Sequence, residues 1–130
     1  MKGHVALSLT VVLAWSLGAQ DASRKPDASR KPDASRQPDK VVSIVTERFA
    51  FSPSRIRVKQ GSLVELVVTS DDTDHGFRLP GANVDVAIPQ QGKGEVRIRF
   101  LANKKGVFPF ECSRPCGAGH NLMRGSIEVE

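Results

Sequence analysis

The stretch RIRVKQGSLVELVVTS, residues 55–70, indicates the fold class of this 130-residue chain. In its first half Ile56 and Val58 alternate with Arg and Lys, so apolar side chains point to one face and charged side chains to the other. Its second half follows a turn signal at Gly61 and is rich in β-branched residues. This period of two predicts β-strands that each place one face against a core.

The same pattern recurs toward the end of the chain. EVRIRF, residues 95–100, alternates again, and GSIEVE, residues 125–130, is also strand-like. Turn signals containing Pro, Gly or Asp separate these segments at intervals of about ten residues. No segment shows helical periodicity for longer than a turn. The sequence therefore predicts an all-β sandwich of about seven or eight strands, formed by residues 41–130.

The first 40 residues have a different composition. Residues 1–19 combine Lys2, an apolar run and small residues at the end, which is the layout of a secretory signal peptide, with an uncleaved anchor as the alternative. Residues 20–40 contain the tandem hexapeptides DASRKP, DASRKP and DASRQP, which cannot bury an apolar face and predict a disordered linker. We expect an exported protein, periplasmic or extracytoplasmic, with membrane contact only through an uncleaved N-terminus.

The charge of the chain does not indicate a nucleic-acid partner. Its net charge is +5, but residues 41–130 contain twelve Lys and Arg against ten Asp and Glu. Tyr is absent and Trp15 lies in the predicted signal peptide, so the domain has neither residue type for stacking bases. We expect a monomer that does not bind nucleic acid.

Most of the soft donor atoms of the chain gather in FECSRPCGAGHNLM, residues 110–123. Their side chains are those of Cys112, Cys116, His120 and Met123. Each donor follows the previous one by about one turn, and the intervening glycines allow a loop to aim them at one point. Outside the signal peptide, His75 is the remaining histidine that could complete a site.

Three simpler interpretations of these donors leave some of them unused. A disulfide, the usual pairing in exported proteins, gives the histidines and Met123 no role. A zinc site of two Cys and two His also leaves Met123 unused. A blue-type copper site of one Cys, two His and Met leaves Cys112 unused. If both sulfurs bridge two coppers, all these donors and one backbone carbonyl complete two four-coordinate sites. The alternatives stay open at this point, although only the two-copper site uses every donor.

The stretch resembles the dinuclear CuA centre of cytochrome c oxidase subunit II and of nitrous oxide reductase. The motif of that family has two cysteines three residues apart, then His and Met, with a first His far upstream. FAFSPSRIRVKQGSLVELVVTSDDTDHGFRLPGANVDVAIP, residues 49–89, contains a similar Ser-x-Asp-x-x-His segment. GVFPFECSRPCGAGHNLMRGSIEVE, residues 106–130, resembles the ligand loop and last strand. The resemblance implies a cupredoxin-like Greek-key β-sandwich.

The resemblance also implies a cofactor of two copper ions and a role for each ligand. The implied ligands are the bridging thiolates of Cys112 and Cys116, the imidazoles of His75 and His120, the weakly bound Met123 and the backbone carbonyl of Arg114. The implied protein is a carrier of one electron, not an enzyme by itself, and its redox partner is a c-type cytochrome or an oxidase. Copper delivery or storage for oxidase assembly is the alternative, as is a single-metal module with blue copper or zinc.

The sequence departs from the family pattern near the expected metal edge. Arg114 stands where the family commonly has an acidic or amide residue, and Arg124 and Arg78 are expected nearby. Positive charge at this edge favours a higher reduction potential and repels a basic cytochrome c. The Trp that the oxidase family uses for electron entry has no counterpart after residue 19, and the transmembrane hairpin of subunit II is not found. A standard oxidase subunit is therefore not expected.

Overall fold

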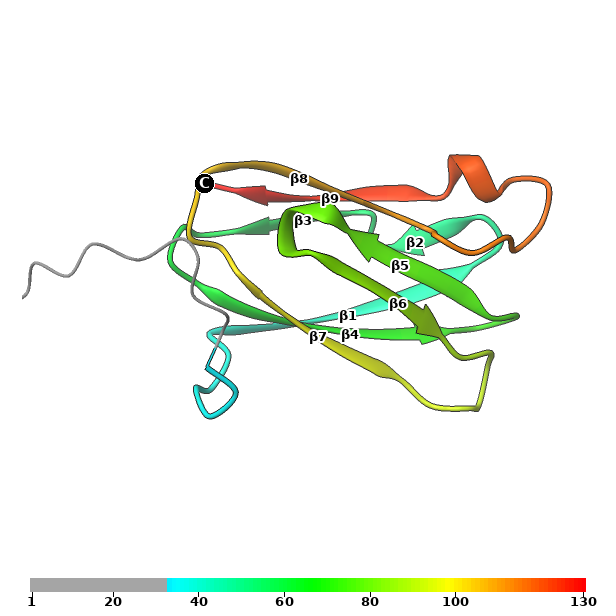
Figure 1. Ribbon diagram of the computed structural model, residues 1–130, viewed down its shortest axis with the longest axis horizontal. Helices are drawn as coiled ribbons and strands as arrows, with labels where there is room; N and C mark the ends of the chain where they lie inside the picture. The colour runs from blue at the N-terminus through cyan, green and yellow to red at the C-terminus, as the bar shows by residue number, and fades with distance from the viewer. Residues whose placement is uncertain (1–32) are drawn as a thin grey trace, which may run out of the picture.

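The computed structural model describes residues 33–130, and Figure 1 shows them as a sandwich of two β-sheets. The predicted signal peptide, residues 1–19, and residues 20–32 of the predicted linker lie outside the described residues. Within the described part, the structure contains no helix that is long and apolar enough to cross a membrane.

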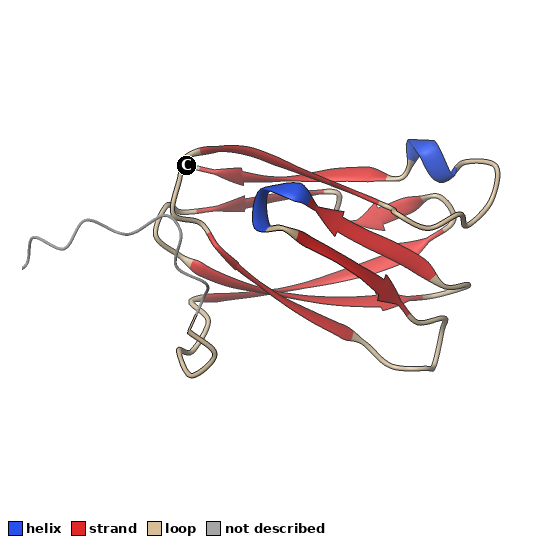
Figure 2. Ribbon diagram, viewed as in Figure 1, coloured by secondary structure: helices blue, strands red, loops and turns tan. Residues whose placement is uncertain are grey.

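The strands of the two sheets follow the alternating segments of the sequence. The first sheet has the order β2-β1-β4-β7, with strands at Ala50–Ser52, Lys40–Glu47, Leu63–Ser70 and Val96–Leu101. The second sheet has the order β3-β9-β8-β5-β6, with strands at Arg55–Val58, Arg124–Val129, Gly106–Glu111, His75–Leu79 and Val84–Ile88. Two short 3-10 helices, η1 (Pro80–Ala82) and η2 (His120–Leu122), lie in loops of the second sheet (Figure 2).

The predicted all-β sandwich is confirmed, with nine strands in the described residues where seven or eight were expected. One reason for the difference is β2, which spans only three residues and is too short for an alternating pattern to be recognised. The chain crosses repeatedly between the sheets, and β1 consequently pairs in parallel with β4, as β3 does with β9. The other strand pairs are antiparallel.

Most of the apolar residues that alternate with charged residues in the sequence are buried in the structure, and the charged residues are exposed or partly exposed. In β3, Ile56 and Val58 are buried and the arginines that alternate with them are exposed; in β7, Ile98 and Phe100 are buried, Arg97 is exposed and Arg99 is partly exposed. β4 is buried along most of its length because it is a central strand, paired with β1 on one side and β7 on the other. The apolar faces of both sheets therefore form one continuous core.

Three aromatic rings fill the core beneath one end of the sandwich. The rings of Phe77 and Phe110 stack with centroids 5.0 Å apart, and Phe51 meets both rings edge to face. Phe77 lies two residues after His75, and Phe110 lies two residues before Cys112. Side chains two residues apart on a strand point to the same face. The three rings therefore pack in the core directly beneath the predicted metal donors.

The last hexapeptide, which belongs to the linker predicted over residues 20–40, contacts the first sheet. Arg99 of β7 directs its Nη1 atom at three backbone carbonyl oxygens, at distances of 2.8 to 3.3 Å, from Asp33, Ala34 and Arg36. Asp39 then receives the backbone N–H of Leu63 on its carboxylate at 2.7 Å. Composition did not reveal this docking because backbone carbonyls, and not apolar side chains, make the contacts.

Replacing Arg99 with Ala is expected to release residues 33–36 while the sandwich stays folded. The loss of charge-assisted hydrogen bonds at a partly exposed site should lower the free energy of unfolding by about 1 kcal/mol. Limited trypsin digestion should then cut after Arg36 faster than in the unchanged chain. Arg97→Ala is the matched control, because Arg97 also pairs with Glu65, whereas its second partner is Glu95 and not the hexapeptide backbone. Equal cutting rates in both variants would contradict the docking role of Arg99.

Candidate metal centre

The predicted donors lie together at one end of the sandwich. His75 is the first residue of β5, and Cys112 immediately follows β8. The loop from β8 to β9, drawn in orange at the right of Figure 1, carries Cys116 and then His120 as the first residue of η2. Met123 ends this loop, one residue before β9. Neighbouring strands of the second sheet and one loop thus bring together donors that are 48 residues apart in sequence, from 75 to 123.

The two cysteine sulfurs are at the middle of the cluster. Their Sγ atoms are 3.8 Å apart, and one ring nitrogen of His75 and both sulfurs lie within 4.8 Å of one another. The Sγ atom of Cys116 is also 3.8 Å from Nδ1 of His120 and 3.8 Å from Sδ of Met123. Cys116 is therefore the sulfur around which the other donors converge.

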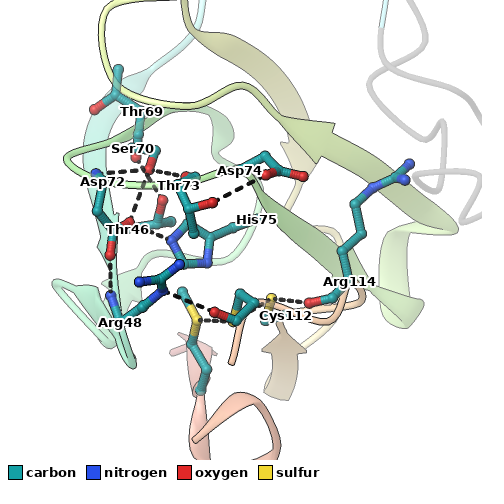
Figure 3. A network of polar contacts seen from close by, with 12 residues as sticks. Thr46, Arg48, Thr69, Ser70, Asp72, Thr73, Asp74, His75, Cys112 and Arg114 are labelled. Atoms are coloured by element: carbon teal, nitrogen blue, oxygen red, sulfur yellow. Dashed lines mark hydrogen bonds and ion pairs between the residues drawn. The ribbon is translucent and has the colours of Figure 1, made fainter. Parts of the chain in front are cut away.

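The backbone carbonyl of Arg114 faces the cluster, and its side chain does not. The carbonyl oxygen lies 3.2 Å from Sγ of Cys112. Figure 3 shows the guanidinium of Arg114 extending away from the sulfurs on the far side of its own backbone. The carbonyl oxygen of Arg114 is therefore available as a donor, while its positively charged guanidinium lies away from the cluster.

Most of the donors are shielded from solvent. The side chains of His75 and Met123 are fully buried, and the two cysteines are at most 6% exposed. His120 is half-buried and lies nearest the surface. Both cysteines are free, and their separation is far longer than a disulfide bond of about 2.05 Å. Cys112 and Cys116 therefore do not form a disulfide in this structure, although a disulfide was one interpretation of the sequence.

His75 is oriented with one nitrogen free to bind a metal. Its Nε2 lies 2.7 Å from a carboxylate oxygen of Asp72, so Nε2–H donates to that oxygen. Its Nδ1 is buried and has no hydrogen-bond partner among the described residues. A buried nitrogen without a partner costs about 1–3 kcal/mol. A metal at Nδ1 would remove this cost, and a ligating histidine typically donates its other ring N–H to a carboxylate in this way.

The pKa values of two groups reflect this environment. Partial burial raises the pKa of Asp72, but hydrogen bonds from His75 and from the backbone of Arg48 outweigh it and hold the pKa below its ordinary value. Burial and the hydrogen bond with Cys112 raise the pKa of the Cys116 thiol to about 11. Because thiolates are the ligating form, a metal must displace this proton when it binds.

Backbone hydrogen bonds connect the loop to the neighbouring strands. The N–H of Cys112 donates to the carbonyl of Met123 at 3.0 Å, which closes the ligand loop at its base. The N–H of Gly76 points at Sγ of Cys112 at 3.5 Å. A Cβ on Gly76 would lie 2.3 Å from Oγ of Ser113 and 2.8 Å from the backbone nitrogen of Arg114. β5 and the loop are therefore in such close contact that only glycine fits between them.

The turn between β1 and β2 holds both halves of the site from the other sheet. The N–H of Arg48 donates to the carboxylate of Asp72 at 2.9 Å, and Nε of Arg48 donates to the carbonyl of Cys116 at 2.9 Å (Figure 3). The ring of Phe49 packs so closely on the loop that a Cβ on Gly119 would lie 2.3 Å from it. Arg48 and Phe49 thus link the support of His75 to the loop that carries the cysteines.

Replacing Arg48 with Ala is expected to loosen the metal centre without unfolding the sandwich. Partners that orient metal ligands change metal affinity by about 10–100-fold, so copper should dissociate about tenfold faster. Copper release to a chelator, followed by absorption, measures this rate. Arg55→Ala is the control, because Arg55 is a surface residue paired only with Glu128. Equal release rates in the two variants would show that Arg48 does not support the loop.

The fold agrees with a comparison to known protein families. The family described as "Cupredoxin-like domain" matches residues 6–128 of the chain. The chain belongs to the cupredoxin-like domain family. The two-sheet sandwich of its described residues is consistent with this family.

The cupredoxin domain is similar to two kinds of curated proteins, cytochrome c oxidase subunit 2 and nitrous-oxide reductase. It is 33% identical over 90 residues to cytochrome c oxidase subunit 2 of Thermus thermophilus, covering 68% of this chain and 64% of that protein. It is 36% identical over 93 residues to nitrous-oxide reductase of Cupriavidus necator, covering 68% of this chain and 14% of that protein. The chain therefore spans less than two thirds of each of these relatives.

A solved structure confirms the fold. The periplasmic domain of subunit II of cytochrome oxidase from Bradyrhizobium japonicum aligns with a TM-score of 0.66, covering 73% of this chain and 86% of that one. Sequence identity across this alignment is 19%. The expected relation to the oxidase subunit II and nitrous-oxide reductase families is thus confirmed by the sequence relatives, and the cupredoxin fold by the structure.

The donors predicted for this cupredoxin domain lie together, but the sequence did not indicate the residues that orient them. Asp72 stood in the Ser-x-Asp-x-x-His segment, three residues before His75, and that spacing was the signal that could have shown its role. Arg48 gave no signal, because its two contacts are with residues 24 and 68 positions away in sequence. The role of Phe49 likewise follows only from the packing of the two sheets.

Proposed function

We propose that this domain carries one electron at a dinuclear copper site. The proposed ligands are the side chains of His75, Cys112, Cys116, His120 and Met123 and the backbone carbonyl of Arg114. The observation that carries the proposal is the buried, unpartnered Nδ1 of His75 beside two free cysteine sulfurs. A single cluster of imidazole, thiol and thioether groups is a donor set that suits copper.

The number of sulfur donors favours two metals over one. A closed zinc site would use two Cys and two His. Sδ of Met123, however, lies at 3.8 Å from Sγ of Cys116, within the cluster and not elsewhere in the core. A blue-type site would use one Cys, yet Sγ of Cys112 is as close to Cys116 as the other donors are. Two coppers sharing both thiolates would let one electron spread over both metals.

The protein would keep the donor atoms in fixed positions and exclude water from them. The loop is closed by the hydrogen bond from Cys112 to Met123, and Asp72 holds the ring of His75. The stacked Phe77 and Phe110 exclude water from the inner side. Donors that cannot move are suited to electron transfer, because little rearranges when the charge changes. His120, half-buried, is the ligand through which electrons would reach a partner.

Copper delivery or storage is the competing function and predicts different kinetics. A delivery protein must release copper readily to an acceptor, but four of the five donor side chains here are buried. Burial favours retention of copper and therefore an electron carrier.

The same proposal includes a redox partner, which would be a c-type cytochrome or an oxidase, and an extracytoplasmic location. The structural neighbour from Bradyrhizobium, itself a periplasmic domain, supports that location.

Metal analysis and spectroscopy of the loaded protein test the proposal. We expect two coppers per chain and a paramagnetic resonance spectrum in which one unpaired electron is shared by two copper nuclei. One copper per chain with a single-nucleus spectrum would point to the blue-type site, and a colourless zinc form would reject electron transfer altogether. Rapid transfer of copper to a competing chelator would favour delivery.

A further inference from the structure

We propose that the surface around His120 docks an acidic redox partner. The positive charge at this surface would repel a basic cytochrome c. The proposal rests on the proposed electron-transfer function, because docking there has a purpose only if His120 passes electrons. It is carried by one exposed apolar side chain next to His120 and by two arginines of the same region, Arg114 and Arg124, that form no ion pair in the described residues.

The apolar contact point is Leu122. It is 81% exposed and lies in η2, two residues after His120. Its position is held by a hydrogen bond from its own N–H to the carbonyl of Gly119 at 2.9 Å. A single exposed leucine is common on protein surfaces. Its place beside the half-buried His120 makes it a contact point for a partner that must approach that ligand.

The cavity beside His120 carries more positive than negative charge. A cavity of about 260 Å³ opens next to His120, and both Arg78 and Arg124 line it with Glu111 as the one acidic residue. Arg78 is already held by Glu111 at 2.5 Å. Arg124 forms no ion pair with any residue in 33–130. The cavity wall therefore carries one unneutralised positive charge directly after the ligand Met123.

Arg114 adds a second charge on the same end of the molecule. Its side chain is exposed, points away from the sulfurs in Figure 3 and has no carboxylate partner in the described part of the chain. The sheet arginines differ: Arg57 pairs with Glu128, and Arg97 and Arg99 pair with Glu65. Ion pairing thus neutralises Arg57, Arg97 and Arg99, whereas Arg114 and Arg124 stay available to a partner.

Unneutralised cations beside a contact point determine which partner approaches. Complementary charge speeds association and like charge suppresses it, by about 10–1,000-fold at low salt. An acidic redox protein would be drawn toward Leu122 and His120, whereas a basic one would be repelled. The effect must weaken as salt increases, because exposed charges are screened beyond about 10 Å at 0.1 M ionic strength.

The first test maps where an anion gathers on the protein. The full chain is loaded with metal and fully reduced, so that it is diamagnetic, and titrated with the paramagnetic trianion hexacyanochromate(III) while amide signals are followed by NMR. We expect residues 120–124 to broaden first. The tris(ethylenediamine)chromium(III) cation should not broaden them. Earlier broadening at Lys104 and Lys105, at the opposite end of β8, or uniform broadening, would overturn the proposal.

The second test compares two charge reversals of equal size. Arg124→Glu should slow reduction of the copper-loaded chain by hexacyanoferrate(II) about tenfold at low salt, and the difference should shrink as salt is added. Lys104→Glu changes the net charge equally at the far end and should leave the rate near that of the unchanged chain. Equal slowing in both variants would show that only net charge matters and would overturn a local docking surface.

The two tests separate this proposal from the one it rests on. If the loaded protein lacks a two-copper signal, the proposed electron transfer fails, but the NMR titration still shows whether the anion gathers at residues 120–124. If the two-copper signal is present and the anion gathers elsewhere, the electron carrier stands and the acidic partner is rejected.

Discussion

Cys116→Ser should abolish tight copper binding, whereas Cys112→Ser should leave one copper per chain. The reason is the asymmetry of the cluster: Sγ of Cys116 lies 3.8 Å from Nδ1 of His120 and from Sδ of Met123. Without Cys112, the chain still offers one Cys, two His and Met, which is the donor set of a blue-type copper site. Without Cys116, His120 and Met123 lose the sulfur beside which they lie.

Copper content and paramagnetic resonance measure both outcomes. Changes in groups that merely orient ligands cost about 10–100-fold in metal affinity, so losing the central sulfur should cost about 100-fold or more. For Cys112→Ser we expect a single-nucleus copper spectrum in place of the shared one. Ser113→Ala serves as control, because its hydroxyl donates to Asp85 and not to the cluster. Two coppers retained in Cys112→Ser would refute bridging sulfurs.

Gly76→Ala should damage the metal centre and the fold together. The added Cβ would lie 2.3 Å from Oγ of Ser113 and less than 3 Å from two backbone nitrogens of the ligand loop. Side-chain atoms can turn away, but the backbone of Ser113 and Arg114 cannot move without displacing Cys112. Overpacking of this kind costs about 1–3 kcal/mol of stability. We expect a loss at the upper end and copper content below two per chain.

Denaturant unfolding of the metal-free chain and copper analysis of the loaded chain measure the two effects separately. Gly81→Ala is the matched control, because the atoms nearest to its added Cβ belong to the half-buried ring of Phe108, which can shift, and not to backbone. That variant should lose less stability and keep its copper. Full copper binding in Gly76→Ala would mean that the loop tolerates displacement, and would contradict the rigidity on which the electron-transfer proposal depends.

The strands and the donors could be predicted because each depends on a local pattern. Alternation at Ile56 and Val58 follows from the two-residue period of a strand, and the same period explains Ile98 and Phe100. The three-residue β2 could not be predicted, because it is too short to show any period. The docking of the last hexapeptide was missed for a related reason, since its contacts to Arg99 use backbone atoms that composition does not describe.

The amino-acid order alone predicted an all-β domain, which the structure confirms, and a set of candidate donors for a soft metal, because strand periodicity and residue chemistry depend on neighbouring residues. It did not reveal that Asp72 orients His75, that Arg48 and Phe49 hold the ligand loop, or that Arg114 turns its charge outward. Those properties join segments that are distant in the chain. They arise only when the two sheets pack and bring one turn of the first sheet against the loop of the second.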